Sequence, residues 1–498
     1  MAAPVAFSLL DGEHIAIVGP NGGGKSMLVD MITGAHPMAS GRPEYDFSPS
    51  RKPLVSDNIK HITFRDMYGG DNDRTYYLQQ RWNQAELNDD MPTVGDVLRH
   101  DYSITGKDTS ECRTLVKRLF DTFGMSSMTG GYSAGESHAR LFADDRAHPM
   151  LSKYVILLSS GEMRKLRIIR ALMAEPRVLI MDNPFIGLDA EARRQVATLM
   201  SAMSRERALQ IILVISKTSD IPDFITHVVE VKGKTVGKKM TIDEYRSLGR
   251  AIPEHVLTPS KREEIINLPV KHGDYKARTV IDMRQLSIRY GARTIIDNLS
   301  WTVLNGERWA LGGPNGSGKS TLLSLVCADN PQGYACDITL FDRKRGSGES
   351  IWDIKRHIGY VSPEMHRAYH HDMPAIRIVA SGLHDSVGLH VRVADGELAA
   401  CKWWMRMFGL SGLEDRPFLS LSSGQQRLTL LARAFVKDPE LLILDEPLHG
   451  LDDSNCRLVL DIIETFCERL NKTLIMVTHY VKELPSCIDK QLILQKHI

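Results

Sequence analysis

Two segments of the chain, 178–189 and 441–452, carry the same pattern, and this repetition restricts the fold more than any other feature. Each starts with four apolar residues, continues through an aspartate and a proline, and ends in Gly-Leu-Asp. The apolar run predicts a buried strand, and acids at the tip of such a strand can hold a metal ion and a water beside a phosphate. In the second segment Glu446 follows the strand-end aspartate, whereas the first segment has Asn183 at that place.

A glycine-rich phosphate loop also occurs twice. Residues 19–26 and 313–320 both fit Gly-x4-Gly-Lys-Ser, and both follow a short apolar strand pattern. Glycines allow backbone N–H groups to point at phosphate oxygens, and the helix that follows adds its dipole. The two lysines, Lys25 and Lys319, are 294 positions apart, and the triplet before each strand (Asp-Gly-Glu, then Asn-Gly-Glu) repeats at the same offset.

A third repeat, Leu-Ser-Ser-Gly, lies between these motifs at 158–161 and 421–424. Its glycine precedes the strand-end aspartate by 21 residues in both halves, and that aspartate precedes the aspartate of Gly-Leu-Asp by seven residues in both. Chance does not give such fixed spacing, so we infer two copies of one domain in tandem. The length of 498 residues also exceeds one comfortable core.

Together these motifs resemble those of the ATP-binding-cassette (ABC) family, with a Walker A loop, a signature sequence, a Walker B strand and a D-loop in each half. The resemblance implies an α/β fold of two tandem P-loop NTPase domains, each a RecA-like core with an antiparallel β subdomain and a helical signature subdomain. We expect these domains at 1–240 and 279–498, with a linker at 241–278. Only ten residues precede Asp11, so we expect the β subdomain of the first domain to be truncated.

The resemblance also implies two composite ATP sites, because cassettes of this family pack head to tail and hold each ATP between the Walker motifs of one and the signature of the other. The first-half residues that it assigns to ATP binding are Gly19, Asn21, Gly22, Gly24, Lys25, Ser26, Gln80, Ser159, Gly161, Asp182 and Asp189. The second-half residues are Tyr290, Gly313, Asn315, Gly316, Gly318, Lys319, Ser320, Thr321, Ser422, Gly424, Asp445 and Asp452. The residues expected to hold Mg²⁺, partly through water, are Ser26, Gln80, Asp182, Ser320 and Asp445.

Only the second half carries the full set expected for hydrolysis. Glu446 is the natural base for the attacking water, Lys319 holds the phosphates, and His479 matches the switch histidine that contacts the γ-phosphate. In the first half Asn183 replaces the glutamate, and Ser216 stands 34 residues after the Walker B aspartate, as His479 does in the second half. Loss of a general base typically costs about 10²–10⁴-fold in rate. We therefore expect the first site to bind ATP with little hydrolysis.

The Q-loop and the A-loop also differ between the halves. Gln80 fits the Q-loop pattern of the first half, whereas Pro363 stands at the expected glutamine of the second half, with Glu364 next to it. In transporters of the family this glutamine connects the nucleotide site to the permease, so its loss weakens the case for ordinary coupling through the second half. Tyr290 matches the aromatic A-loop residue that stacks on adenine, and the first half has no counterpart.

Charge and cysteine content favour a cytoplasmic protein, or a peripheral one at the inner face of a membrane. The 62 basic and 61 acidic residues leave a net charge of +1, and the excess of five positive charges in 232–278 fits a solvated connector better than a nucleic-acid contact. The seven scattered cysteines fit reduced thiols and give no metal-cluster signal. No apolar run approaches the roughly 20 residues that span a bilayer. His366, His370 and His371 fit a solvated surface better than a metal site.

Segments of the second half, 331–334, 340–343, 345–355 and 357–362, further resemble the ModF-type twin-cassette proteins, which are named as molybdenum-transport ATP-binding proteins. This resemblance implies an ATPase that drives a permease or another protein partner, although no residue predicts a molybdate site. Two alternatives stay open. One is a ribosome-associated ABC-F-like translation factor, which resembles a pattern with both glutamates and a longer basic linker. The other is the ATPase subunit of a sugar-type importer, in which the second Walker A is usually the damaged one.

Overall fold

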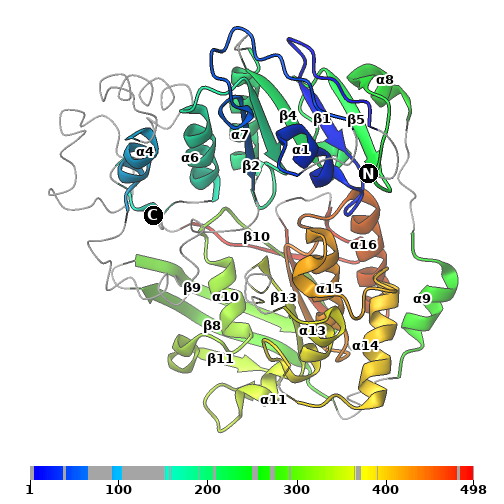
Figure 1. Ribbon diagram of the computed structural model, residues 1–498. Helices are drawn as coiled ribbons and strands as arrows, with labels where there is room; N and C mark the ends of the chain where they lie inside the picture. The colour runs from blue at the N-terminus through cyan, green and yellow to red at the C-terminus, as the bar shows by residue number, and fades with distance from the viewer. Residues whose placement is uncertain are drawn as a thin grey trace. The chain divides into compact units, whose positions relative to one another are not determined.

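The computed structural model contains two compact units, residues 1–250 and 251–498 (Figure 1). The residues that the structure describes are 5–36, 41–64, 92–103, 151, 153–155, 158, 160–188, 190–205, 209–249, 256–269, 275–290, 293–363, 365, 369, 372–389, 391–470, 472–478, 480 and 483–496. Within this part of the chain, no helix combines the length and the apolar character needed to cross a membrane.

The first unit is built on one mostly parallel sheet in the order β2-β3-β4-β1-β5-β6, with β7 also paired to β5. Its described strands are β1 (Ile15–Val18), β2 (Ile59–Thr63), β3 (Val178–Asp182), β4 (Gln210–Ile215), β5 (His227–Lys232), β6 (Thr235–Val236) and β7 (Met240–Thr241). Its described helices are α1 (Lys25–Thr33), α2 (Val55–Asn58), α4 (Val94–Ser103), α6 (Ser160–Leu172), α7 (Ala190–Met203), the 3₁₀ turn η4 (Thr218–Asp220) and α8 (Ile242–Ser247).

Both faces of this sheet are covered, which explains why its strands are apolar without alternation. Helices α4, α6 and α7 pack on one face, where Ala16, Leu179 and Leu213 belong to the core. Helix α1 packs on the other face, against Ile180 and Ile212. Strand β1 is buried at all four residues, so the phosphate loop that follows it starts from a fixed position.

The second unit contains a five-stranded parallel sheet in the order β13-β14-β15-β10-β16 and a four-stranded antiparallel sheet in the order β12-β11-β8-β9. Its described strands are β8 (Thr279–Tyr290), β9 (Arg293–Leu304), β10 (Arg308–Gly312), β11 (Asp337–Leu340), β12 (Arg343–Lys344), β13 (Ile358–Val361), β14 (Leu441–Asp445), β15 (Thr473–Val477) and β16 (Lys490–Ile493). Its described helices are α9 (Pro259–Ile266), α10 (Lys319–Val326), η5 (Pro331–Ala335), α11 (Ile351–Lys355), α13 (Ala375–Ser381), η6 (Gly382–His384), α14 (Asp395–Met407), η7 (Phe418–Ser420), α15 (Ser423–Phe435) and α16 (Asp453–Cys467).

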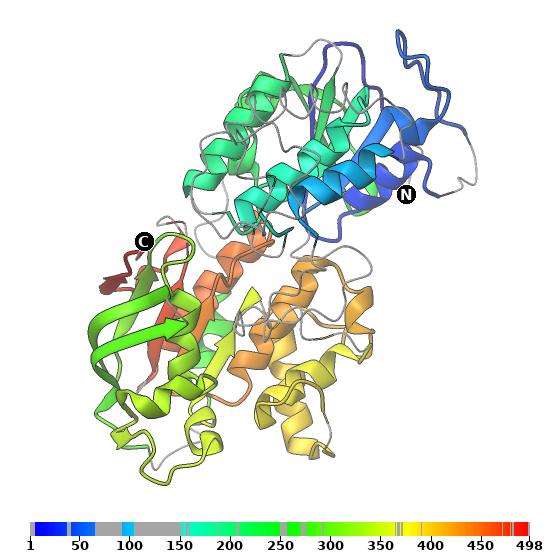
Figure 2. The ribbon, with the colours of Figure 1, turned by 90° about the vertical axis from the view of Figure 1, so that its left-hand side faces the viewer.

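Helices α13 to α16 share one core, in which Trp404, Phe408, Phe435 and Phe466 contact one another. The antiparallel sheet and α10 share the other core. Figures 1 and 2 show the antiparallel sheet and the helices α13 and α14 on opposite sides of the second unit. This arrangement confirms the predicted division into an α/β core, a β subdomain and a helical subdomain.

The two parallel sheets have the same strand order, so β2, β3, β4, β1 and β5 correspond to β13, β14, β15, β10 and β16. The predicted tandem α/β architecture is confirmed. In the first unit, Val5, Phe7 and Leu9 pack against the core on the α1 side of the sheet. The second unit has the long antiparallel hairpin β8–β9 in the core on the corresponding side.

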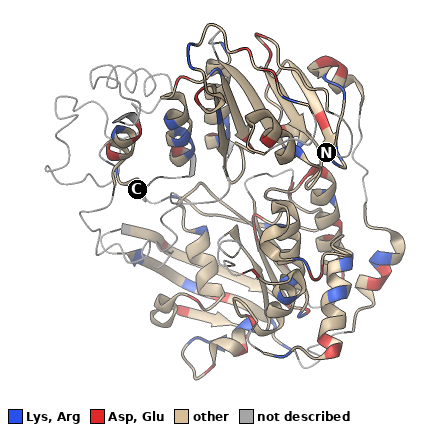
Figure 3. Cartoon of the chain, in the orientation of Figure 1, with Lys and Arg blue, Asp and Glu red and all other residues tan. Residues whose placement is uncertain are grey.

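The expected linker, 241–278, is not simply a solvated connector where the structure describes it. Helix α9 packs on α16, and Ile265 within it is fully buried. Glu264 accepts hydrogen bonds from the indole of Trp403 (3.0 Å) and from Arg406 Nη2 (2.6 Å). Figure 3 shows charged positions of both signs along α9 and α14. Glu264 and Arg262 form ion pairs with Arg406 and Glu468, so α9 is held by an apolar anchor flanked by ion pairs. The excess of positive charge in the sequence gave no indication that Ile265 is buried.

Candidate functional site

The two phosphate loops start with glycines that no other residue could replace without displacing backbone. Gly19 and Gly313 have positive φ angles of 148° and 136°. A Cβ on Gly19 would lie 2.0 Å from the carbonyl oxygen of Val231, and one on Gly313 would lie 2.5 Å from that of Leu494. The first loop therefore lies directly against strand β5, and the second lies directly against the residue that follows β16.

Each loop lysine folds back over its own loop. Lys25 Nζ donates to the carbonyl oxygens of Gly19 (2.7 Å) and Pro20 (3.0 Å), and Lys319 Nζ donates to those of Gly313 (2.8 Å) and Pro314 (3.0 Å). The ammonium groups are thus held at the concave side of the loop, where a phosphate is expected to bind.

Helices α1 and α10 begin at these lysines. The residue before each, Gly24 or Gly318, has a left-handed backbone and provides no side-chain cap. The first-turn serines Ser26 and Ser320 are exposed at the helix N-termini. The predicted loop residues Asn21, Gly22, Asn315, Gly316 and Thr321 lie in the same two loops and first helical turns.

The strand-end aspartates lie at the same edge of the sheets as the loops. Asp182 and Asp445 are the last residues of β3 and β14, and in each sheet only one parallel strand separates them from the strand that leads into the loop. Asp445 is only 7% exposed. This is the position at which open α/β sheets bind ligands, beyond the carboxyl ends of the strands.

Glu446 stands in a left-handed turn directly after β14. Its φ angle is 51°, and its backbone N–H donates to the carbonyl oxygen of Val477 at 2.9 Å. Burial, together with the charges of Asp445 and Glu483, raises the pKa of Glu446 to about 8. A carboxylate with such a pKa is a stronger proton acceptor than an ordinary surface carboxylate.

Asn183 occupies the same backbone position in the first unit. Its φ angle is 50°, and its N–H donates to the carbonyl oxygen of Val214 at 2.8 Å. Its side-chain amide donates to Oδ1 of Asp182 at 2.9 Å. The replacement therefore keeps the turn and exchanges a proton acceptor for a donor directed at the neighbouring aspartate.

Ser216 lies directly after β4 and contacts the first phosphate loop. Its hydroxyl donates to Oδ1 of Asn21 at 3.1 Å, and the residue is buried. Because β4 pairs with β1 in the same register as β15 pairs with β10, Ser216 occupies the position that corresponds to His479. His479 itself lies outside the described residues.

Comparison with known proteins identifies the family. A family model described as "ABC transporter" matches residues 2–186 and 296–449. The chain belongs to the ABC transporter family of ATP-binding proteins. Members of this family hydrolyse ATP, and this chain is accordingly an ABC ATPase with two cassettes.

Two relatives are similar to this ABC ATPase over nearly its whole length. It is 34% identical to the ABC transporter ATP-binding protein ModF of Escherichia coli over 98% of this chain and 92% of that protein. It is 29% identical to an uncharacterized ABC transporter ATP-binding protein of Schizosaccharomyces pombe, over 98% and 93%. The crystal structure of an archaeal ribosome recycling factor, aABCE1, with the stalk protein aP1 matches 97% of this chain and 83% of that chain, with a TM-score of 0.53 and 16% identity. That likeness shows the fold alone.

The ABC signature of the second unit forms a helix cap. Ser422 caps α15 by accepting from the N–H of Gln425 (3.3 Å), while the Gln425 side chain accepts from the N–H of Ser422 (3.0 Å). Gly424 lies in the first turn of α15, as Gly161 lies in the first turn of α6. In the first unit Glu162 stands where Gln425 stands, and it pairs with Lys153 at 2.9 Å. Ser159 lies outside the described residues.

The D-loop aspartate of the second unit also has a capping role. Asp452 caps α16, and its two carboxylate oxygens accept from the backbone N–H (2.8 Å) and the side chain (2.9 Å) of Asn455. Asp189, its counterpart, lies outside the described residues.

Tyr290 is the last residue of β8, and its hydroxyl accepts a hydrogen bond from Asn330 at 3.0 Å. Burial raises the pKa of this phenol. The hydrogen bond orients the ring at the end of the antiparallel sheet, so the predicted A-loop residue is held by a partner that the sequence did not single out.

Strand pairing relates a residue of the first unit to Pro363, and the sequence did not single out that residue. Strand β2 pairs with β3 as β13 pairs with β14, so Phe64 corresponds to Pro363, the residue that we aligned with the Q-loop glutamine. Gln80 lies outside the described residues, as do Glu364 and the histidines 366, 370 and 371. The equivalence rests on strand pairing and could not be derived from the sequence, in which Gln80 offered the better local match.

A second missed feature is an arginine that lies three residues after each signature glycine. Arg427 and Arg164 are buried, and they donate to the carbonyl oxygens of Pro447 (3.3 Å) and Pro184 (2.7 Å). These prolines immediately follow Glu446 and Asn183. The repeated spacing, Gly-x-x-Arg in both halves, was a signal available in the sequence.

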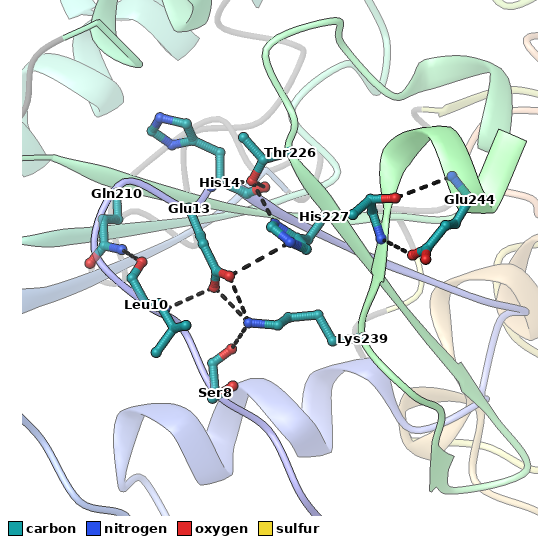
Figure 4. A network of polar contacts seen from close by, with 10 residues as sticks. Ser8, Leu10, Glu13, His14, Gln210, Thr226, His227, Lys239 and Glu244 are labelled. Atoms are coloured by element: carbon teal, nitrogen blue, oxygen red, sulfur yellow. Dashed lines mark hydrogen bonds and ion pairs between the residues drawn. The ribbon is translucent and has the colours of Figure 1, made fainter.

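At the opposite end of the Walker A strand, a glutamate closes the turn that leads into it. Glu13 accepts from the N–H of Leu10 (2.8 Å) and from Lys239 (2.7 Å), as Figure 4 shows. Glu307 also forms an ion pair, with Lys490 of β16. Although burial opposes the shift, these donors hold the pKa of both glutamates below the usual value. The repeated triplet thus has a structural role away from the phosphate loop.

The donors near the phosphate loops suit a hard cation. Ser320 supplies a hydroxyl oxygen and Asp445 a carboxylate, and the same pair occurs as Ser26 and Asp182. Oxygen donors of this kind, together with phosphate oxygens and water, are those that Mg²⁺ prefers. The residues present therefore fit the metal that ATP hydrolysis requires.

Proposed function

We propose that this ABC ATPase hydrolyses ATP mainly at one of two composite sites. The competent site pairs the Walker motifs of residues 279–498 with the signature of residues 1–240, including Ser159 and Gly161. The other site pairs Lys25, Ser26 and Asp182 with Ser422 and Gly424, and mainly binds ATP. Residues 241–278 connect the two domains.

The observation that carries this proposal is the equivalence of Glu446 and Asn183. Both follow the Walker B aspartate in the same left-handed turn, with φ angles of 51° and 50°. A carboxylate at this position can accept a proton from the attacking water, whereas a carboxamide cannot. Ser216 adds an independent difference, because a hydroxyl replaces the imidazole of His479 at the γ-phosphate position.

In the competent site, Lys319 and the N–H groups at the start of α10 bind the phosphates, and Glu446 orients and deprotonates water. Mg²⁺, held by Ser320 and through water by Asp445, would neutralise charge on the phosphates. The other composite site, here called the ATP-only site, mainly binds ATP. It then acts as a slow clamp that keeps the two cassettes together while the competent site hydrolyses ATP.

The proposed role is to couple this cycle to a partner. ABC transporter ATP-binding proteins usually act with a permease, and the similarity to ModF supports a partner of that kind. Pro363 at the end of β13 removes the polar side chain that would ordinarily connect the second site to a permease. We therefore propose that coupling does not run through an ordinary Q-loop glutamine of the second cassette.

Steady-state hydrolysis by matched variants tests the assignment. Glu446→Gln should lower kcat at least about 10²-fold. Asn183→Gln, which places the same side chain at the equivalent turn, should leave kcat within about threefold of wild type. ATP binding should persist in both. Substantial turnover by Glu446→Gln, or a large loss in Asn183→Gln, would overturn the proposed asymmetry.

A further inference from the structure

Arg427 on α15 is a buried cation whose described partners are backbone carbonyls. Its side chain lies inside the second unit, and the residue is only 3% exposed. A buried guanidinium must satisfy its N–H donors, and planar forked donors do so best with several acceptors at fixed positions. The acceptors here lie at the carboxyl ends of β13 and β14, the edge that carries the Walker B residues.

Four carbonyl oxygens receive these donors. Arg427 Nη2 donates to Asp445 at 2.7 Å and also to Glu446, Nε donates to Pro447 at 3.3 Å, and Nη1 donates to Ser362 at 3.1 Å. Three of the acceptors are consecutive residues of the turn that contains Glu446. The fourth is at the end of β13. Arg427 thus connects the turn to the neighbouring strand.

The turn needs such support. A non-glycine residue in the left-handed region costs about 1–3 kcal/mol and persists only where surrounding contacts fix it. The N–H of Glu446 is fixed by the carbonyl of Val477. The carbonyl side of the same peptide units is fixed by Arg427, through charge-assisted hydrogen bonds. Together they set the direction in which the Glu446 carboxylate points.

We propose that Arg427 is a positioning residue for ATP hydrolysis, which fixes the Glu446 turn and joins it to the signature helix. The inference rests on the proposed role of Glu446 as the base. Because α15 starts at Ser422 and Gly424, a displacement of that helix moves Arg427 and therefore the turn. Hydrolysis in the second cassette is then sensitive to nucleotide bound by its own signature, at the ATP-only site.

Arg433 provides a control on the same helix. It is also buried in α15, but its Nε donates to Oγ of Ser381 and its Nη2 to the carbonyl oxygen of Ser386, both at 3.1 Å. These acceptors lie at the end of α13 and after η6, and not in the Glu446 turn. The same substitution at Arg433 should therefore leave hydrolysis nearly unchanged. Arg164, the counterpart of Arg427, is unsuitable because α6 begins with the signature of the competent site.

The test compares Arg427→Lys with Arg433→Lys in the full chain. A lysine keeps the charge but cannot reach four carbonyls, so kcat of Arg427→Lys should fall about 10²-fold, the size expected for a misplaced catalytic group. KM and ATP affinity should change less than about threefold, as should kcat of Arg433→Lys. If Arg427→Lys does not fold, Arg427→Gln, which keeps two donors, takes its place.

A second comparison separates positioning from general structural damage. In a Glu446→Gln background, Arg427→Lys should cause no further loss of the residual single-turnover rate, because the group that it positions is already absent. A further loss of similar size, an equal loss in the Arg433 variant, or wild-type kcat in Arg427→Lys would overturn the inference. Wild-type turnover by Glu446→Gln alone would instead overturn the proposed function.

Discussion

The side-chain amide of Asn183 donates a hydrogen bond of 2.9 Å to Oδ1 of Asp182, the Walker B aspartate of the first cassette. In the second cassette the corresponding neighbours are Asp445 and Glu446, and burial first, then the charge of Asp445, raises the pKa of Glu446. After the Walker B aspartate, the first cassette has an amide that attracts Asp182, and the second has a carboxyl group whose negative charge Asp445 would repel. The first site is locally relaxed, and the second holds a carboxylate under electrostatic strain.

Restoring a carboxylate at position 183 should restore ATP hydrolysis in the first cassette only in part. In a Glu446→Gln background, Asn183→Glu should raise turnover, but to less than about one tenth of the wild-type rate. Adding Ser216→His should raise it further, because both the base and the switch imidazole are then present. Phosphate release in multiple-turnover assays measures this. Wild-type turnover from Asn183→Glu alone would show that Ser216 does not limit the first site.

The strain at Glu446 should appear in the pH dependence of stability. Its pKa is about 8 in the folded chain and near 4.5 ordinarily. Folding therefore favours the protonated acid, so this residue costs nothing below pH 4.5 and destabilises the chain increasingly as pH rises towards 8. Glu446→Gln should thus raise the Tm of the nucleotide-free protein by several degrees at pH 8 and leave it nearly unchanged at pH 4.5.

Thermal unfolding at both pH values measures this effect, with Asn183→Gln as the control. That change exchanges one neutral amide for another in the equivalent turn, so its Tm difference from wild type should be the same at both pH values. A Glu446→Gln difference that is also independent of pH would mean that the glutamate is not strained in the resting protein.

Much of this arrangement could be predicted from the sequence, because repetition at fixed spacing identified both phosphate loops, both Walker B strands and the difference at Asn183. The sequence could not show which residue of the first cassette corresponds to Pro363. Phe64 acquires that correspondence from the pairing of β2 with β3, a contact between residues more than 100 positions apart. Nor did it show that Arg427 reaches the Glu446 turn, since a helix arginine is ordinarily expected to be solvated.

The Walker A glycine should be far less replaceable than a glycine of similar backbone nearby. Gly313→Ala places a Cβ 2.5 Å from the carbonyl oxygen of Leu494 and 2.7 Å from Ser317 Oγ. Gly306 also has a positive φ, of 82°, but its Cβ would meet nothing within 4 Å. Gly306→Ala should cost about 1–2 kcal/mol, whereas Gly313→Ala should cost more and abolish hydrolysis.

Denaturant unfolding and ATPase assays of these two variants measure the difference. Both variants lose stability because alanine is unfavourable at a positive φ angle. The comparison therefore isolates the effect of the close contact between the loop and Leu494, the residue after β16. Similar losses of stability and activity in the two variants would show that backbone conformation alone, and not the contact, makes Gly313 necessary.

The anchoring of α9 gives a prediction about the connection between the cassettes. Ile265 is fully buried, whereas its neighbour Ile266 is 40% exposed. Truncating a buried isoleucine typically costs about 2–5 kcal/mol, so Ile265→Ala should lower the free energy of unfolding of the second unit by that order. Ile266→Ala should stay within about 0.5 kcal/mol of wild type. Equal, small effects in denaturant titrations would mean that α9 is a loosely attached connector, as the charge of 232–278 had suggested, whereas the expected difference makes it part of the folded second unit.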